Sequence, residues 1–112
     1  MSRYADNFSK NIQTYMLDNG ISGNSLAVTS GISQKTIWVT QAGKTTPTVN
    51  TAEAIANALN LDARVLMARE LDSDQMDRSK RLGRLLDQLI DLSSEEVSHI
   101  MAIVGAFKRD LT

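Results

Sequence analysis

The chain has 112 residues, of which 42% are hydrophobic and 4% aromatic; it contains no cysteine, and its formal net charge is −1. This length suits one small domain with an appendage, and the hydrophobic content supports a mainly aliphatic core rather than global disorder. The lack of cysteine excludes disulfides, thiol catalysis and cysteine-ligated zinc. Residues 1–10 are too polar for a secretory signal and no run approaches a membrane span, so we expect a cytoplasmic protein that does not bind membranes.

The first part of the chain predicts five helices separated by short turns. They are expected over residues 6–19, 23–30, 34–42, 51–59 and 63–70. Their expected N-caps are, in order, Asp6, Ser22, Ser33, Asn50 and Asp62, because short polar side chains accept hydrogen bonds from the free N–H groups of a first turn. The residues expected to follow the first four helices are Gly20, Gly31, Gly43 and Asn60, which tolerate a left-handed backbone.

The second part of the chain predicts two amphipathic helices. Residues 71–77 form either a linker or a helix start, and a leucine-rich apolar stripe then runs from Leu82 to Leu92. Ser93 and Glu96 have the spacing of a capping box, and a second apolar stripe from Val97 to Phe107 follows them. Two such helices joined by a short loop are expected to pack as an antiparallel pair. With no credible strand, the sequence predicts an all-α protein.

Three residues of the second and third helices have the spacing of a helix-turn-helix. Ala27 is small enough for two helices to approach closely, Gly31 can adopt a positive φ in the turn, and Ile37 can fill the corner between the helices. The second helix of such a motif can enter the major groove of DNA.

Residues 11–67 resemble the lambda-repressor-like DNA-binding domain of phage repressors, Cro proteins and XRE-type regulators. The resemblance lies in Leu26-Ala27, residues 31–37 (GISQKTI), residues 43–48 (GKTTPT) and residues 54–61 (AIANALNL). It implies a five-helix DNA-binding domain, which we place over residues 1–71. The two apolar stripes add the expectation of a C-terminal antiparallel helical hairpin over residues 72–112 that serves dimerisation.

In the family that the chain resembles, the start of the third helix contacts bases. The matching positions are Ser33, Gln34 and Lys35, with Val39 one turn further along. Gln34 has the groups to bond adenine, Lys35 can donate to guanine, and Val39 can contact a thymine methyl group. The alternative interpretation of Gln34 and Lys35 is an ordinary solvated helix face.

A second set of residues is expected to contact the DNA backbone. These residues are Asn24, Ser25, Thr36, Trp38, Lys44 and Thr45, several of them near helix ends where free N–H groups favour phosphate. Residues 1–50 hold four basic and two acidic residues, whereas residues 51–112 hold eight basic and eleven acidic residues. This weak positive charge implies few phosphate contacts and a need for a dimer to gain affinity.

Three positions depart from the family pattern. Thr40 stands where a large apolar residue is usual, Gln41 where an acid often ties the third helix to the first, and Trp38 where a small or polar residue is common. Trp38 has three open interpretations: it contacts sugar–phosphate, packs against a partner subunit, or fills space left by Thr40. Packing is the commoner fate of a tryptophan.

The two apolar stripes also have two interpretations. Either the two helices simply cover each other and the five-helix core, or they pair with a second chain, which we favour. The expected dimerisation residues are Leu82, Leu85, Leu89, Leu92, Val97, Ile100, Val104 and Phe107. A two-fold dimer would read two half-sites about one helical turn, or roughly 34 Å, apart.

The sequence therefore predicts a homodimeric transcriptional regulator, most like a phage or prophage repressor, that binds a palindromic operator in double-stranded DNA. The alternative is an antitoxin-like or anti-repressor module whose apolar surface binds another protein and whose DNA binding is weakened or lost. No catalytic constellation, metal cluster, cofactor motif or small-molecule site stands out, and His99, the single histidine, lies on an expected helix. We therefore do not expect an enzyme.

Overall fold

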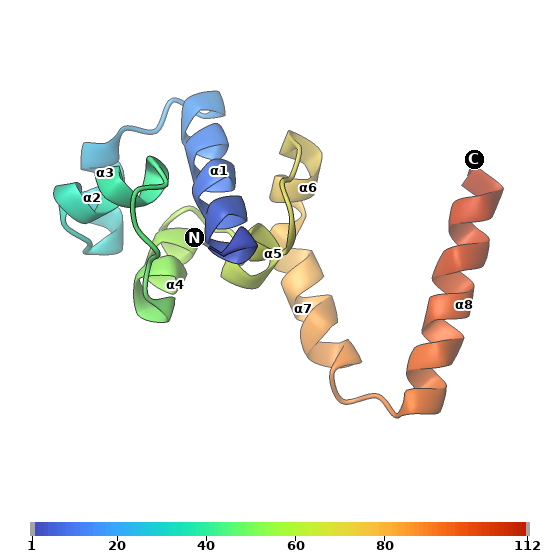
Figure 1. Ribbon diagram of the computed structural model, residues 1–112. Coiled ribbons are helices and arrows are strands. Elements are labelled where there is room, and N and C mark those ends of the chain that lie inside the picture. The colour runs from blue at the N-terminus through green and yellow to red at the C-terminus, as the bar shows by residue number, and fades with distance from the viewer. Residues whose placement is uncertain (1, 112) are drawn as a thin grey trace.

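A computed structural model describes residues 2–111, without the side chains of residues 110 and 111, and the regular secondary structure of this part of the chain consists of α-helices only. The helices are α1 (Arg3–Asp18), α2 (Gly23–Ser30), α3 (Gln34–Gln41), α4 (Val49–Ala58), α5 (Ala63–Ala68), α6 (Ser73–Asp77), α7 (Ser79–Leu89) and α8 (Ser94–Leu111). The first six form a compact body, and α7 leads away from it to α8 (Figure 1). The all-α class expected from the sequence is thus observed.

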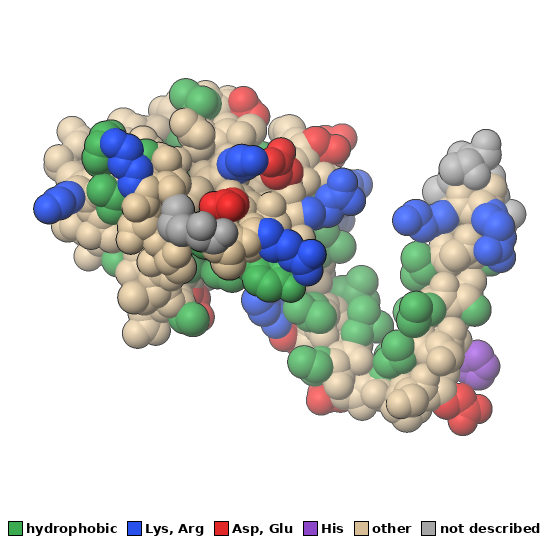
Figure 2. Space-filling view, in the orientation of Figure 1, with side chains coloured by type: hydrophobic (Ala, Val, Ile, Leu, Met, Phe, Trp, Pro, Cys, Tyr) green, Lys and Arg blue, Asp and Glu red, His purple; other side chains and the backbone are tan. Residues whose placement is uncertain are grey.

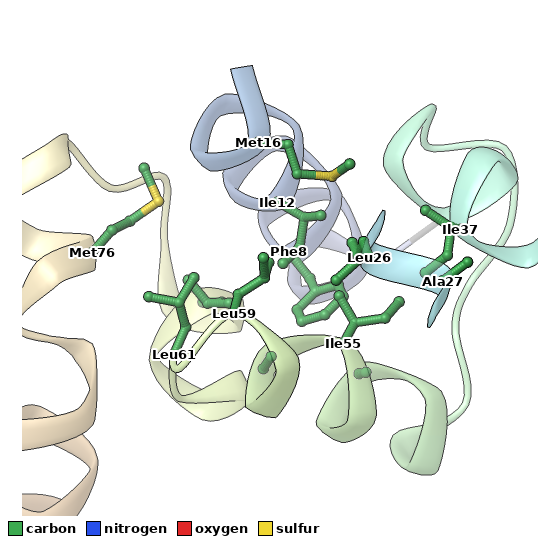
Figure 3. Packing of buried hydrophobic residues seen from close by; sticks show 13 residues of the cluster. Phe8, Ile12, Met16, Leu26, Ala27, Ile37, Ile55, Leu59, Leu61 and Met76 are labelled. Carbon is green, nitrogen blue, oxygen red and sulfur yellow. The ribbon is translucent and has the colours of Figure 1, made fainter. Parts of the chain in front are cut away.

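The core of the body is aliphatic apart from one aromatic ring. Phe8 and Ile12 of α1 point toward Leu26 of α2 and Ile55 of α4, as Figure 3 shows, and all four are fully buried. Leu66 of α5 is also fully buried in this cluster. Each such side chain contributes about 1.5–3 kcal/mol when it leaves water, so these few residues account for much of the body's stability.

Most of the expected helix caps are confirmed. Ser22, Ser33 and Asp62 each accept a hydrogen bond from a backbone N–H of the following first turn. Gly31 ends α2 with a φ of 74°, and Asn60 follows α4 with a φ of 58°, both in the left-handed region. These features depend on neighbours within four residues, which is why the sequence predicts them.

Two helices begin earlier than expected. The first begins at Arg3, because the side chain of Ser2 rather than Asp6 accepts from the N–H of Ala5. The fourth begins at Val49, because Thr48 rather than Asn50 is the N-cap and its Oγ1 accepts from a backbone N–H at 3.1 Å. In both helices the N-cap is a hydroxyl side chain that lies earlier in the sequence than the expected N-cap residue.

The fifth helix ends at Ala68, two residues earlier than expected, because Asn11 of α1 binds its last turn. The buried Asn11 side chain donates to the carbonyl oxygens of Leu66 and Arg69 at 2.9 and 2.8 Å. Its own oxygen accepts from the N–H of Leu71 at 2.9 Å. These three bonds turn the chain away from α5 and fasten it to α1.

Residues 71–77, expected as a linker or helix start, contain the short helix α6. Asp72 and Gln75 form its capping box, and the fully buried Met76 joins the core. The Ser79 hydroxyl is buried and accepts from the N–H of Asp62 at 3.2 Å. The packed body therefore continues past residue 71, where the sequence placed its domain boundary.

An ion-pair cluster attaches α7 to the body. Arg64 of α5 contacts the carboxylate of Asp62 at 3.0 Å and that of Asp87 at 2.6 Å, and it also donates to the carbonyl oxygen of Gly83 at 3.1 Å. Burial by itself raises the pKa of Asp62, whose side chain is 14% exposed, but hydrogen bonds from Arg64 and the N–H of Val65 outweigh it and the net pKa is lowered. The contacts to Gly83 and Asp87 set the direction in which α7 leaves the body.

The expected antiparallel pair of C-terminal helices is not closed. The capping box is confirmed, since Glu96 N–H donates to Ser93 Oγ and Ser93 N–H donates to the Glu96 carboxylate. However, α7 and α8 diverge from the loop as an open V and do not pack along their lengths (Figure 1). Their facing sides are rich in uncovered hydrophobic side chains (Figure 2). Within residues 2–111, no helix is long and apolar enough to cross a lipid bilayer.

Candidate nucleic-acid interface

The turn between α2 and α3 is built by local hydrogen bonds and one apolar corner. The N–H of Gly31 donates to the carbonyl oxygen of Ala27 at 2.9 Å, and Ser33 Oγ accepts from the N–H of Thr36 at 3.2 Å to start α3. Ile37 is fully buried and Ala27 nearly so, and α2 packs against α3. The geometry presents the start of α3 on the surface of the body.

The residues expected to contact bases lie together at the start of α3. Ser33, Gln34 and Lys35 are exposed, and Val39 lies one turn further along and is half-buried. The Ser33 hydroxyl also donates to Thr36 Oγ1 at 2.9 Å. The side chains of Gln34 and Lys35 form no hydrogen bond or ion pair with another described residue, so both are available to a ligand, and Lys35 adds a positive charge here.

A groove connects the start of α2 with the exposed side of α3. It has a volume of about 400 Å³, and its lining includes Asn24, Gln34 and Trp38. The structure thus brings a residue expected to contact bases next to two expected to contact the backbone. Ser25 is exposed beside the groove, and its hydroxyl donates to the carbonyl oxygen of Ser22 at 3.2 Å.

Trp38, which lines this groove, also contacts Lys44 from the loop after α3. The Lys44 ammonium lies 4.4 Å from the centre of the Trp38 ring, a cation–π contact, and Trp38 is 53% exposed. About half of the Trp38 surface thus remains available to a ligand or a partner chain. Thr45 follows in the loop after α3 and is half-buried.

The segment that forms this surface carries positive charge only. No acidic residue occurs between Asp18 and Glu53, whereas Lys35 and Lys44 lie within that interval. The N-terminal ends of α2 and α3 add partial positive charge from their free N–H groups. The weak positive character expected from the sequence is thus concentrated on one segment.

Two buried polar residues of the body differ in whether their polar groups are paired, and the sequence predicted neither result. Thr40 is fully buried at the expected inner position of α3, but its Oγ1 has no hydrogen-bond partner among the described residues. Asn11 holds α1 to the end of α5 through the three bonds described above. A polar residue beside Ile12 in the apolar face of α1 was the available signal for Asn11.

Other chemistry has little support in the described part of the chain. Among residues 2–111, no group of three His, Asp or Glu side chains is placed to hold a metal ion. The charged groove of about 400 Å³ between α4, α5 and α7 is lined by Arg64, Asp62 and Asp87, which are engaged with one another. His99 is exposed on α8.

Comparison with known proteins does not assign the chain to a family. No family model matches the sequence, and neither a curated protein nor a solved structure is significantly similar to it. The function proposed below is therefore inferred from this chain's own residues and geometry.

Proposed function

We propose that the protein is a sequence-specific DNA-binding transcriptional regulator that binds a palindromic operator as a homodimer in the cytoplasm. The observation that carries the proposal is the exposed start of α3, where Ser33, Gln34 and Lys35 follow a tight turn from α2. In this proposal, α1–α5 form a lambda-repressor-like domain and α3 lies in the major groove.

The side chains at the start of α3 supply the means of reading bases. Gln34 donates and accepts at the N6 and N7 edge of adenine, and Lys35 donates to O6 and N7 of guanine. Val39 is half-buried, so only part of its side chain remains to contact a thymine methyl group. Base discrimination then depends mainly on Gln34 and Lys35.

The surrounding groups supply the contacts to the DNA backbone. Asn24 and Ser25 lie in the first turn of α2, where free N–H groups favour phosphate. Lys44, in the loop after α3, lies over the ring of Trp38 and supplies a positive charge beside α3. Because only two lysines serve this surface, one copy neutralises few phosphates, and two copies on a two-fold site double that number.

The test compares two double variants that remove the same chemical groups. Gln34→Ala/Lys35→Ala removes the proposed base contacts, whereas Lys10→Ala/Gln13→Ala removes an exposed lysine and glutamine from α1. An operator is first selected from random duplex DNA with the wild-type protein. Its affinity is then measured by gel shift and by Trp38 fluorescence over a range of salt concentrations.

We expect the α3 variant to bind the selected operator at least about tenfold more weakly, since each good base contact contributes about 1–3 kcal/mol of discrimination. We expect the α1 variant to bind like the wild type. Equal loss in both variants, or no salt-dependent binding of the wild type to any duplex, would contradict the proposal.

A second candidate function is an antitoxin-like or anti-repressor module that binds another protein. The open apolar V of α7 and α8 and the exposed Trp38 favour it. In that case Gln34→Ala/Lys35→Ala leaves partner binding intact, and substitutions on α8 abolish it.

A further inference from the structure

The largest set of uncovered hydrophobic side chains lies on α7, α8 and the loop between them. Ten of the fifteen large hydrophobic side chains exposed in the described chain belong to residues 82–107. Leu85 is 47% exposed, Val104 50% and Phe107 63%. Hydrophobic surface gathered in this way on a small protein marks an interaction site.

The expected dimerisation residues are largely accessible. Six of them are exposed and two, Leu89 and Leu92, are half-buried. An apolar groove of about 310 Å³ between α5 and α7, lined by Leu82 and Leu86, extends this surface toward the body. The apolar surface therefore runs from the body along α7 and across the V to α8.

Repulsion between like charges opposes the packing of α8 against α7 of the same chain. Arg78 and Arg81 lie at the start of α7, and Lys108 lies in the last turn of α8. If the two helices closed as an antiparallel pair, the end of α8 would lie beside the start of α7. Cations would then face cations across a helix pair, which is unfavourable.

An α8 that runs in the opposite direction, parallel to α7, would bring complementary charges together. An α8 that runs parallel to α7 places Glu95 and Glu96 beside Arg78 and Arg81, with Arg69 on the rim of the apolar groove nearby. Its Lys108 then lies at the C-terminal end of α7, where the partial negative charge of the helix favours a cation. No α8 of the same chain can reach this orientation through the short loop.

We propose that a second copy of the chain supplies this α8, so that two V-shaped arms interlock into a four-helix bundle with their loops at opposite ends. In such a bundle each α7 lies parallel to the partner's α8. With 18 residues against 11, α8 also extends beyond the end of α7 and covers the loop, where Ile90 is 75% exposed. This arrangement rests on the homodimer of the proposed function and specifies how the copies pair.

The absence of cysteine from the sequence allows a direct test by disulfide cross-linking. Chains with Arg81→Cys are mixed with differently tagged chains carrying Glu96→Cys, refolded together and oxidised, and mixed-tag dimers are counted on a non-reducing gel. The matched mixture combines Arg81→Cys with Lys108→Cys. Because each chain has a single cysteine, a mixed-tag band reports contact between two copies.

We expect a strong mixed-tag band for positions 81 and 96 and at least a tenfold weaker one for positions 81 and 108. The reverse pattern would overturn the arrangement while leaving a homodimer, with loops at the same end. A wild-type chain that sediments as a monomer at 100 µM, a concentration chosen to reveal even a weak dimer, would overturn both the arrangement and the homodimer.

Two further variants separate pairing from folding. Val104→Glu lies on the apolar face of α8 and is expected to give a monomer with unchanged helical circular dichroism. Ser98→Glu, on the other side of the same helix, is expected to leave the dimer intact. A Val104→Glu chain that remains dimeric would contradict the proposal. If the 81–96 band forms but no DNA is bound, the arrangement holds and the proposed function fails.

Discussion

Thr40 offers a sharp test of the packing of the body, because its hydroxyl is buried without a partner. The side chain is 0% exposed, and Oγ1 forms no hydrogen bond with any described residue. An unsatisfied buried polar group costs about 1–3 kcal/mol. Thr40→Val replaces the hydroxyl with a methyl group of nearly the same shape, and the two residues have similar helix propensities. We therefore expect the free energy of unfolding to rise by about 1–3 kcal/mol.

The assay is urea and thermal unfolding followed by circular dichroism at equal protein concentrations, since dimerisation couples stability to concentration. For a domain of this size, each kcal/mol raises Tm by roughly 4–8 °C. Thr14→Val, at an exposed position of α1, is the matched control and is expected to change stability by less than about 0.5 kcal/mol. Thr40→Ser keeps the hydroxyl and removes the methyl group, so it is expected to destabilise the protein.

A Thr40→Val chain that is no more stable than the wild type, with Thr14→Val neutral, would refute this reasoning. It would show that the Thr40 hydroxyl is satisfied in solution, for example by the carbonyl oxygen one turn earlier in α3.

Three further changes test how the helices are held together. Gly83→Ala is expected to destabilise the protein because its new Cβ would collide with the Asp62 carboxylate. In Gly105→Ala the new Cβ meets only a side-chain nitrogen at 3.6 Å, so this variant is expected to stabilise α8 by up to about 1 kcal/mol. Thermal unfolding compares the two variants. Since the folded-state pKa of Asp62 is lowered, its contribution is complete above its unfolded value of about 3.9 and is lost as the pH falls through the folded value. The stability difference between wild type and Asp62→Asn, measured by urea unfolding, should therefore shrink as the pH falls below the unfolded-state pKa, and a constant difference would contradict the assignment. Asn11→Ala should lower the free energy of unfolding by at least about 2 kcal/mol because it leaves buried backbone groups without partners, and a loss below 0.5 kcal/mol would show that water replaces the amide.

The candidate interface was predictable where it depends on local signals. Helix periodicity and the cap at Ser33 place Ser33, Gln34 and Lys35 on the exposed start of α3, and the structure has them there. The contact of Lys44 with Trp38 was not predictable, because it depends on the path of the loop after α3. The same is true of the groove that brings Asn24 beside Gln34 and Trp38.

By itself, the sequence determined the approximate positions of most helices, the caps at Ser22, Ser33 and Asp62, and the turn at Gly31, because each depends on hydrogen bonds and backbone preferences within four residues. Only the tertiary structure decided where α5 ends, because Asn11 reaches it across 55 residues or more. Only the tertiary structure also decided that α7 packs on the body through Arg64 while α8 stands apart. Amphipathic periodicity predicts that a helix has an apolar face. Which surface packs against that face depends on the shape and charge of residues from distant parts of the chain.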